Sequence, residues 1–437
     1  MPQDFWRLPK GVDEVLPPRA RHLELLRRAV LDLFHLHGYD YIEPPIIEYL
    51  DALLVGNDLT LQTLQVADQV SGRTLGVRAD ITSQAARIDA NSLSNSGAVG
   101  GATEDLTRRL CYAGPVVRAN PQGVLESRVP LKAGAEIYGC SGVEADLEIM
   151  CLAIDSLKSA GVKGAVIELG HVGFVRHLVD ELGLSENLRD RLFEAVRIKS
   201  ESDIAAVIEK AKLSSAVSDS TNYNHATDQL CKLVRLMGSS AALDEARALF
   251  NDSASGKGSA GSSAASSSLV ASSSLSDQKL LELVEQLDYC ASRLQQLRPE
   301  IQVRFDLSAP VGFGYHHAMV FALYDPGHGR AVARGGRYDG IGEQFGDARP
   351  ATGFDVNLKT LLGLPAVAER FEQQSSVEAV WVSRSASSSN EVDGLIEAVG
   401  KLRAQGMRVV QALKDSDTRP GDCTRELQHT SNGWELR

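Results

Sequence analysis

The most informative stretch for the fold is Arg334–Gly340, which reads Arg-Gly-Gly-Arg-Tyr-Asp-Gly. Its two adjacent glycines allow the backbone to pass close to a ligand, and Arg337 and Asp339 stand on either side of Tyr338. Glycine pairs also mark tight turns in general. On spacing alone, a turn with a surface ion pair is the favoured interpretation, and a backbone that approaches a ligand is the alternative.

A second informative stretch, Val77–Thr82, predicts the end of a strand followed by the carboxylate of Asp80 and the hydroxyl of Thr82. Such a pair at the rim of a sheet suits an α-ammonium group. Either side chain can equally cap the N-terminus of a helix that carries Gln84 and Arg87. On spacing alone, capping is the favoured interpretation.

A third stretch, Lys132–Glu136, is a strand of small residues that places Lys132, Gly134 and Glu136 on one face. If Glu136 faces a cavity, its charge is costly unless a cation lies beside it. A solvated strand face with neighbouring Lys and Glu side chains explains the same pattern equally well.

A fourth stretch, Gly312–His317, ends in two adjacent histidines. Because side chains alternate across a strand, His316 and His317 cannot both face one metal ion. The sequence has no Gly-x-x-x-x-Gly-Lys-Ser/Thr phosphate loop and no dinucleotide fingerprint after a strand. We therefore expect no metal, no cofactor and no nucleophilic triad, and a role for one histidine in a polar site.

The overall charge disfavours a nucleic-acid partner. The 437 residues include 45 Lys and Arg against 57 Asp and Glu, a net charge of −12, and only 5% are aromatic. Binding a polyanion needs clustered basic residues, and base stacking needs aromatic ones. Six scattered cysteines without a Cys-x-x-Cys pair, and the lack of a leader-like or membrane-length apolar run, predict a reduced, soluble, cytoplasmic protein.

Periodicity predicts an α+β fold, in which an antiparallel or mixed sheet is flanked by helices. Helices are expected at His22–His37 and Ala145–Ala160, and mobile loops at Asp89–Thr103 and within the Ser-rich segment 251–274. The expected domains are a core at 1–365, a helical insertion in it at 170–300 that includes the disordered Ser-rich loop, and a small C-terminal α/β domain at 366–437.

In this order, these stretches resemble the catalytic core of histidyl-tRNA synthetase, a class II aminoacyl-tRNA synthetase, from about Gly38 to Leu364. The matching segments are Arg78–Thr82 on Arg-Pro-Glu-Gly-Thr, Val117-Arg118 at the start of motif 2, Lys132–Glu136 on Gln-x-Gly-x-Glu, Tyr315-His316 on a Tyr-Tyr pair, Gly335–Gly340 on Gly-Gly-Arg-Tyr-Asp-Gly, and Gly353–Leu361 on motif 3.

Departures from this pattern fall on the residues that activate the amino acid. Asn120 stands in place of the motif 2 Glu, Val311 in place of an Arg, Lys359-Thr360 in place of the motif 3 Glu-Arg, and Lys132 in place of a Gln. Adenylate formation relies on fixed cations around the phosphates, and a lysine does not replace an arginine fork. The segment from Ala366 onward has 9 basic and 11 acidic residues and is shorter than an anticodon-binding domain.

With these departures, the chain is similar to the regulatory subunits of ATP phosphoribosyltransferase. This resemblance implies a non-catalytic homodimer, formed through the motif 1 region at Gly38–Glu48, in a larger hetero-oligomer with the short-form catalytic subunit. It would activate the joining of ATP to phosphoribosyl pyrophosphate, the first step of L-histidine biosynthesis, and mediate feedback inhibition by L-histidine without tRNA, membrane or cofactor. The alternatives are a divergent histidyl-tRNA synthetase and a synthetase paralogue that binds another ligand.

The resemblance also implies that the old amino-acid site survives as the histidine effector site. The implied residues are Asp80 and Thr82 for the α-ammonium group, Glu136 for a cationic end of the ligand, Tyr315, His316 and Tyr338 for the imidazole slot, Arg118 near the carboxylate, and Lys132, where the pattern changes.

Overall fold

The protein is represented by a computed structural model, which describes residues 6–54, 62–95, 106–121, 126–214, 220–254, 267–308, 318–341, 345, 349–375, 378–384, 389–431 and 433–437. The chain divides into two compact units, Met1–Val367 (unit 1) and Ala368–Arg437 (unit 2). The sequence places this division two residues earlier, after residue 365.

A mixed main sheet organises unit 1. Its strands are β1 (Asp40–Tyr41), β5 (Arg108–Pro115), β6 (Leu131–Tyr138), β7 (Val166–His171), β8 (Met237–Gly238), β9 (Gln302–Asp306), β10 (Met319–Tyr324), β11 (Ala331–Arg337) and β12 (Ala351–Asn357). Within the described residues their order is β1-β5-β6-β12-β11-β10-β7-β9-β8. The pairs β1–β5 and β7–β9 are parallel and the others antiparallel, which confirms the predicted mixed sheet.

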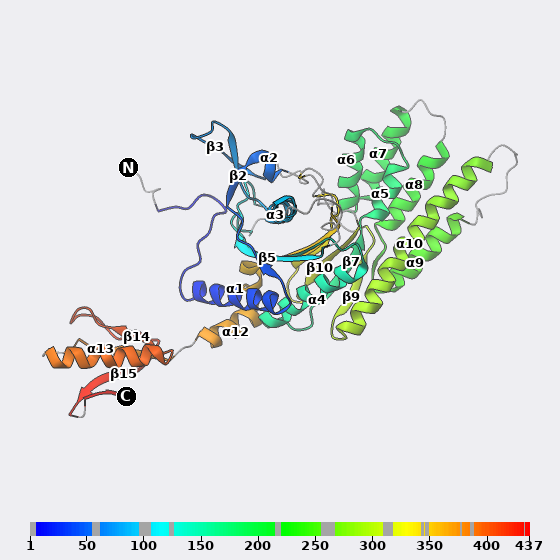
Figure 1. Ribbon diagram of the computed structural model, residues 1–437. Helices are drawn as coiled ribbons and strands as arrows, with labels where there is room; N and C mark the ends of the chain where they lie inside the picture. Colours follow the sequence, from blue (N-terminus) through cyan, green and yellow to red (C-terminus); the bar gives the residue numbers. More distant parts are fainter. Residues whose placement is uncertain are drawn as a thin grey trace. The chain divides into compact units, whose positions relative to one another are not determined.

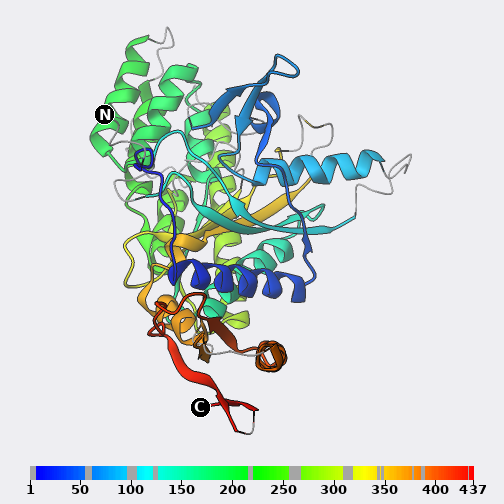
Figure 2. The same ribbon diagram turned by 90° about the vertical axis from the view of Figure 1, so that its left-hand side faces the viewer.

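Helices cover both faces of this sheet. Helices α1 (Arg19–Leu36) and α4 (Val143–Ala160) pack on one face, and α3 (Thr82–Asn95) lies on the other (Figures 1 and 2). Helix α1 buries Leu23, Leu26, Val30 and Phe34, the helical spacing that an amphipathic helix requires. The predicted loop at Asp89–Thr103 is wrong in its first half, because α3 continues to Asn95.

A smaller sheet stands beside the main one. It comprises β2 (Ile47–Tyr49), β3 (Leu64–Ala67) and β4 (Thr74–Val77) in the order β2-β4-β3, with the short helix α2 (Leu50–Leu53) next to it. The buried side chain of Arg78 joins the two sheets, because its Nε donates to the carbonyl of Pro115 at 2.8 Å and its Nη1 to that of Pro44 at 2.7 Å. This junction fixes where the chain enters α3.

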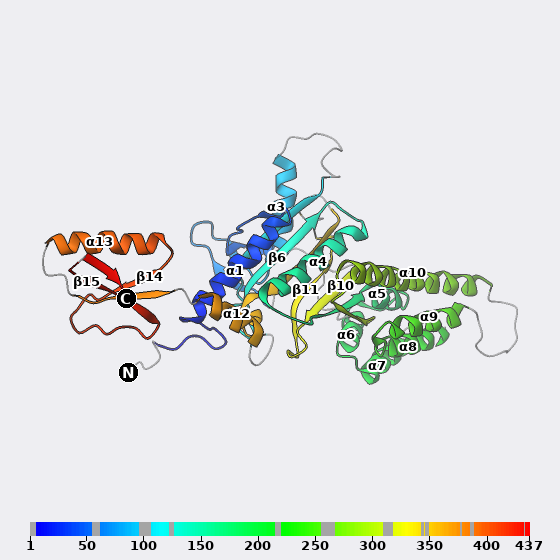
Figure 3. The ribbon, with the colours of Figure 1, turned by 90° about the horizontal axis from the view of Figure 1, so that it is seen from below.

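A helical block lies between β7 and β9 and confirms the predicted helical insertion (Figure 3). Its helices are α5 (Gly173–Asp180), α6 (Glu186–Arg197), α7 (Glu201–Ser214), α8 (Ser220–Leu233), α9 (Ala241–Ala254) and α10 (Ser267–Leu297). The loop predicted at 251–274 is wrong at both ends, since α9 and α10 extend into it, and residues 255–266 lie outside the described residues. Alanine, the strongest helix former, is frequent in this Ser-rich stretch.

Unit 2 is a small α/β domain. Its strands β13 (Ala379–Val382), β14 (Arg408–Gln411), β15 (Cys423–Thr430) and β16 (Gly433–Leu436) follow the order β14-β13-β15-β16, and α13 (Ser389–Ala404) packs on them. The remaining helices are α11 (Leu358–Leu361) and α12 (Pro365–Ser375), which spans the division between the units. Among the described residues, no helix combines the length and apolar character needed to cross a membrane.

Candidate functional site

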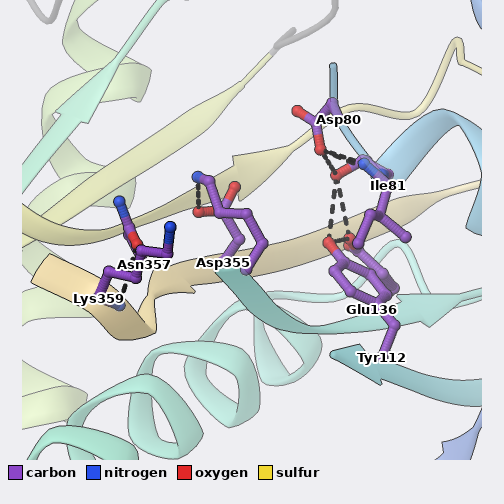
Figure 4. Close-up of polar contacts among 9 residues, drawn as sticks. Asp80, Ile81, Tyr112, Glu136, Asp355, Asn357 and Lys359 are labelled. Carbon is purple, nitrogen blue, oxygen red and sulfur yellow. Dashed lines mark hydrogen bonds and ion pairs between the residues drawn. The ribbon is translucent and has the colours of Figure 1, made fainter. Parts of the chain in front are cut away.

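Glu136, on β6, lies at the centre of a buried group of hydroxyls. Its side chain is only 1% exposed, and its Oε1 accepts hydrogen bonds from the Tyr112 hydroxyl at 2.9 Å and from Thr82 Oγ1 at 3.3 Å. The Tyr338 hydroxyl donates to Oε2. We refer to Thr82, Tyr112, Glu136 and Tyr338 as the Glu136 cluster; Figure 4 shows the contact between Tyr112 and Glu136. The solvated strand face is therefore the wrong interpretation, and within the described part of the chain hydroxyls rather than a cation contact the carboxylate.

Two glycines make room for this cluster. Gly353 on β12 pairs in register with Glu136, and a Cβ at Gly353 would lie 1.5 Å from Glu136 Oε2. Gly134 lies under the ring of Tyr112, where a Cβ would come within 2.6 Å of the ring. The cluster therefore depends on the absence of side chains at two specific positions of the sheet.

The glycine pair of the Arg334–Gly340 stretch lies in a strand, and the turn that the spacing favours comes only after Tyr338. Gly335 and Gly336 pair with Phe354 and Gly353 in the interior of β11. Arg337, which follows them, forms a buried ion pair with Asp146 of α4 and a second ion pair with Asp339, whose side chain is 44% exposed, so the expected ion pair beside Tyr338 is present. This strand delivers the hydroxyl of Tyr338 to Glu136.

Asp80 and Thr82 lie where the chain enters α3. Asp80 Oδ1 accepts the backbone N–H of Ile81 at 2.6 Å and that of Thr82 at 3.2 Å, which confirms the capping interpretation for Asp80. The Thr82 hydroxyl bonds to Glu136 at 3.3 Å. Thus Asp80 fits the capping interpretation of this stretch, and Thr82 fits the interpretation as part of a site.

Lys132 lies four residues before Glu136 on the same face of β6. It forms an ion pair with Asp355 of β12. Their side chains are 15% and 21% exposed, so this pair is closer to solvent than the Glu136 cluster is. The ammonium group of Lys132 thus acts on the carboxyl groups of Asp355 and Asp80, and these two carboxyl groups in turn act on Glu136.

The carboxyl groups of Glu136 and Asp80 hold their protons more strongly than in water. Burial raises the pKa of Glu136 to about 8, although the hydrogen bonds from Tyr338 and Tyr112 act to lower it and the charges of Asp80 and Asp355 raise it further. Burial and the charge of Asp355 also raise the pKa of Asp80, against the opposing charge of Lys132. A site with these properties favours a ligand that brings positive charge.

The other predicted residues have separate outcomes. The backbone of Arg118 forms a bridge with Thr63 and a hydrogen bond with Arg128, in the segment that follows β5. Tyr315 and His316 lie outside the described residues. The prediction that these three side chains bind the ligand therefore stays a prediction.

Two residues of the site escape sequence reasoning: Tyr112 on β5 and Asp355 on β12. The strand signal of β12 was available, since Gly353, Asp355 and Asn357 alternate with apolar residues at period two. For Tyr112, only the register that sets it opposite Gly134 brings its hydroxyl to Glu136.

Lys359, next to the motif 3 position of the missing arginine, has a partner of its own. Its Nζ lies 3.1 Å from both carboxylate oxygens of Asp13, and Ser127 also bonds to Asp13. Partial burial alone would raise the pKa of Asp13, but the hydrogen bonds from Ser127 and Lys359 lower it. The N-terminal segment is thereby fastened to the start of α11.

Comparison with known families agrees with this architecture. Residues 11–270 and 263–361 match the model of the histidyl-tRNA synthetase family, and residues 379–437 match that of the ATP phosphoribosyltransferase subunit HisZ C-terminal domain. The ATP phosphoribosyltransferase regulatory subunit of Alkalilimnicola ehrlichii is 39% identical over 441 residues, which cover 99% of this chain and 97% of the relative. That of Thioalkalivibrio sulfidiphilus is 38% identical over 98% of this chain and 96% of the relative.

The chain belongs to the family of ATP phosphoribosyltransferase regulatory subunits.

Solved structures place this regulatory-subunit family on the class II synthetase fold. A Bacillus halodurans protein, described as an ATP phosphoribosyltransferase regulatory subunit/histidyl-tRNA synthetase, superimposes with a TM-score of 0.67 at 25% identity over 96% of both chains. The histidyl-tRNA synthetase of Nostoc sp. PCC 7120 gives a TM-score of 0.66 at 15% identity over 98% of this chain and 92% of that one. The predicted fold and the predicted family are both confirmed.

Proposed function

We propose that this chain is a non-catalytic subunit that activates a short-form ATP phosphoribosyltransferase in the cytoplasm and makes it sensitive to L-histidine. The name shared by its full-length relatives supports a partnership with that enzyme. The Glu136 cluster is the observation that carries the proposal for the effector, because it forms a buried acidic site on a histidyl-tRNA synthetase fold.

Within this site, the proposed roles follow the charges. Glu136 takes a cationic end of L-histidine, either the ammonium or the imidazole group, and Asp80 and Thr82 take the α-ammonium group at the start of α3. Tyr338 lines the imidazole slot with Tyr315 and His316, and Arg118 lies near the carboxylate. Inhibition then requires L-histidine to bind the inhibited assembly more tightly than the active one.

The lack of catalysis is supported at the motif 3 position. Phosphoryl chemistry needs cations that are free to clamp the phosphates. Lys359 is instead paired with Asp13, and Thr360 follows it where the synthetase pattern has an arginine. Asn120 replaces the carboxylate of motif 2. These residues support a site that holds an amino acid without activating it.

A homodimer is supported by an exposed apolar face on the small sheet. The register of β2, β4 and β3 puts Ile47, Tyr49, Leu64, Val66, Leu75 and Val77 on one face. Ile47 is 52% exposed and Val66 is 50% exposed. Contiguous exposed apolar residues mark interfaces, and this face adjoins the motif 1 region at Gly38–Glu48.

Reconstitution with a short-form catalytic subunit tests the function. We expect the chain to increase the rate of phosphoribosyl-ATP formation, and L-histidine to reverse the increase. With Glu136→Ala, we expect activation to persist and inhibition by L-histidine to weaken at least tenfold. Histidine-dependent exchange of pyrophosphate into ATP by the chain alone would contradict the proposal and favour a divergent synthetase.

A further inference from the structure

The sheet presents a graded row of charges beside the Glu136 cluster. Lys132, Gly134 and Glu136 share one face of β6, and the register sets Asn357, Asp355 and Gly353 opposite them on β12. Alternate residues of a strand are about 7 Å apart. Lys132 is therefore at one end and Glu136, opposite Gly353, at the other, while Asp355 lies opposite Gly134 at the centre.

Among the described contacts, the ammonium group of Lys132 does not bond to Glu136. Its ammonium bonds to Asp355, and Glu136 is bonded instead by hydroxyl groups. An ammonium group has three N–H donors, and among the described residues Asp355 takes one of them. The other donors are free to bind a second acceptor at the more exposed end of the row.

Asp355 would compete with a ligand carboxylate for the ammonium group of Lys132. The charge of Asp355 disfavours the ionised form of Asp80, and Lys132 offsets this at Asp80. A ligand carboxylate that bonds to Lys132 would therefore face Asp355, a like charge, beside it. Tight binding of the ligand requires Lys132 to shift its bond from Asp355 toward the ligand.

We infer that Lys132 is the residue that binds the carboxylate of the effector, and that Lys132 is paired with Asp355 when no effector is bound. This inference rests on the proposed function, because it takes the ligand to be a zwitterionic amino acid. It assigns the recognition of the carboxylate to Lys132 rather than to Arg118. It also explains the acidic and basic ends of the row, since the ligand would lie along β6 with its cationic part at Glu136.

The test compares two ligands that differ in the carboxylate. L-Histidine and L-histidinol, which has an alcohol in its place, are titrated calorimetrically into the full-length chain. In the wild type we expect L-histidine to bind more tightly. A hydrogen bond to a charged group is worth about 1.5–3 kcal/mol, so Lys132→Gln should reduce the ratio of the two affinities about tenfold or more. Lys132→Arg, which keeps the charge, should retain most of the ratio.

Asp355→Asn gives a prediction in the opposite direction. Removing the competing carboxylate should tighten L-histidine binding several-fold and increase its preference over L-histidinol, which a general loss of stability cannot do. The matched control is Lys359→Gln, because Lys359 forms a comparable ion pair with Asp13 on the neighbouring helix. This control should leave the ratio unchanged.

The outcomes separate the inference from the proposed function. If the wild type binds neither ligand, the proposed effector is wrong and this inference falls with it. If the wild type binds L-histidine but Lys132→Gln keeps the ratio of affinities, the proposed function stands and the role of Lys132 is overturned. A loss of the ratio in Arg118→Gln alone would overturn it in the same way.

Discussion

Glu136 is a buried acid without a cationic partner among its described hydrogen bonds, and its pKa is raised to about 8. At pH 7 most of its population is protonated in the empty site. Above pH 7 the imidazole of free histidine is largely neutral. The titration of Glu136 therefore dominates the pH dependence of histidine binding between pH 7 and about 8. A cationic ligand group needs the carboxylate, and binding should therefore release a proton and tighten as pH rises through this window. Calorimetry in two buffers of different ionisation enthalpy measures that release.

Glu136→Gln should abolish this proton release and weaken binding. The same variant tests the stability of the fold. The folded-state pKa of Glu136 lies above the ordinary value of 4.5, so the native state binds more protons than the unfolded one between pH 4.5 and about 8, and the free energy of unfolding falls as pH rises through that range. Glu136→Gln should flatten this slope in urea titrations. An unchanged slope would show that other groups dominate.

Gly353 provides a steric prediction at the same scale. A Cβ there would lie 1.5 Å from Glu136 Oε2, so Gly353→Ala must displace the Glu136 side chain. We expect loss of L-histidine binding and a destabilisation of about 1–3 kcal/mol from overpacking, measured by urea unfolding. Gly329→Ala is the control, because a Cβ at Gly329 meets no atom within 4 Å. Normal histidine affinity in Gly353→Ala would mean that Glu136 is not a ligand.

At the scale of elements, Lys199 fixes the helical block to the main sheet. It lies just after α6 with a φ of 57°, a left-handed conformation that usually selects glycine. Its Nζ bonds to both carboxylate oxygens of the buried Asp306, at 2.8 and 2.9 Å, and to Ser308 at 2.6 Å. This ion pair links the α6–α7 turn to the end of β9.

Lys199→Met should therefore leave the carboxylate of Asp306 buried without its cation. We expect a loss of roughly 3 kcal/mol in the free energy of unfolding, and partial recovery in the double variant with Asp306→Asn. Lys232→Met removes an exposed pair with Asp228 and should cost less than about 1 kcal/mol. Equal effects of the two single variants would show that Lys199 contributes no more than a surface ion pair.

The elements differ in how far local sequence predicts them. Helix α1 follows from apolar periodicity because it has one buried face, whereas strand β6 is buried on both faces along its last six residues and shows no such alternation. The glycine pair at Gly335 was misjudged as a turn, since the reason for it is tertiary: a Cβ there would lie 2.4 Å from the Gly353 carbonyl oxygen and 2.5 Å from the ring of Phe321. Glu136 and Tyr338 can be found by matching motifs. Tyr112 can be found only once the register of the sheet, which sets it opposite Gly134, is known.

At the scale of the whole molecule, the chain keeps a synthetase fold with a net charge of −12, which disfavours contact with a polyanion. The exposed face of the small sheet is apolar instead. Arg73 covers the ring of Tyr49 at 3.6 Å at one edge of this face, and Ile47 and Val66 are left open to solvent. Such a face is costly in an isolated protomer and is stabilised when a second copy covers it.

Ile47→Asp tests this proposed dimer. A charge buried in an apolar interface without a partner costs several kcal/mol, so we expect the dimer dissociation constant to rise at least about a hundredfold. Sedimentation velocity over a range of concentrations measures it. Leu213→Asp is the matched control, because Leu213 is 83% exposed on α7, outside the small sheet, and this variant should stay dimeric.

Because the small sheet continues through Arg78 into Asp80 and Thr82, we further expect a monomeric Ile47→Asp variant to bind L-histidine more weakly. A wild-type chain that sediments as a monomer at all concentrations would refute the dimer, and an Ile47→Asp variant that remains dimeric would place the interface on another face.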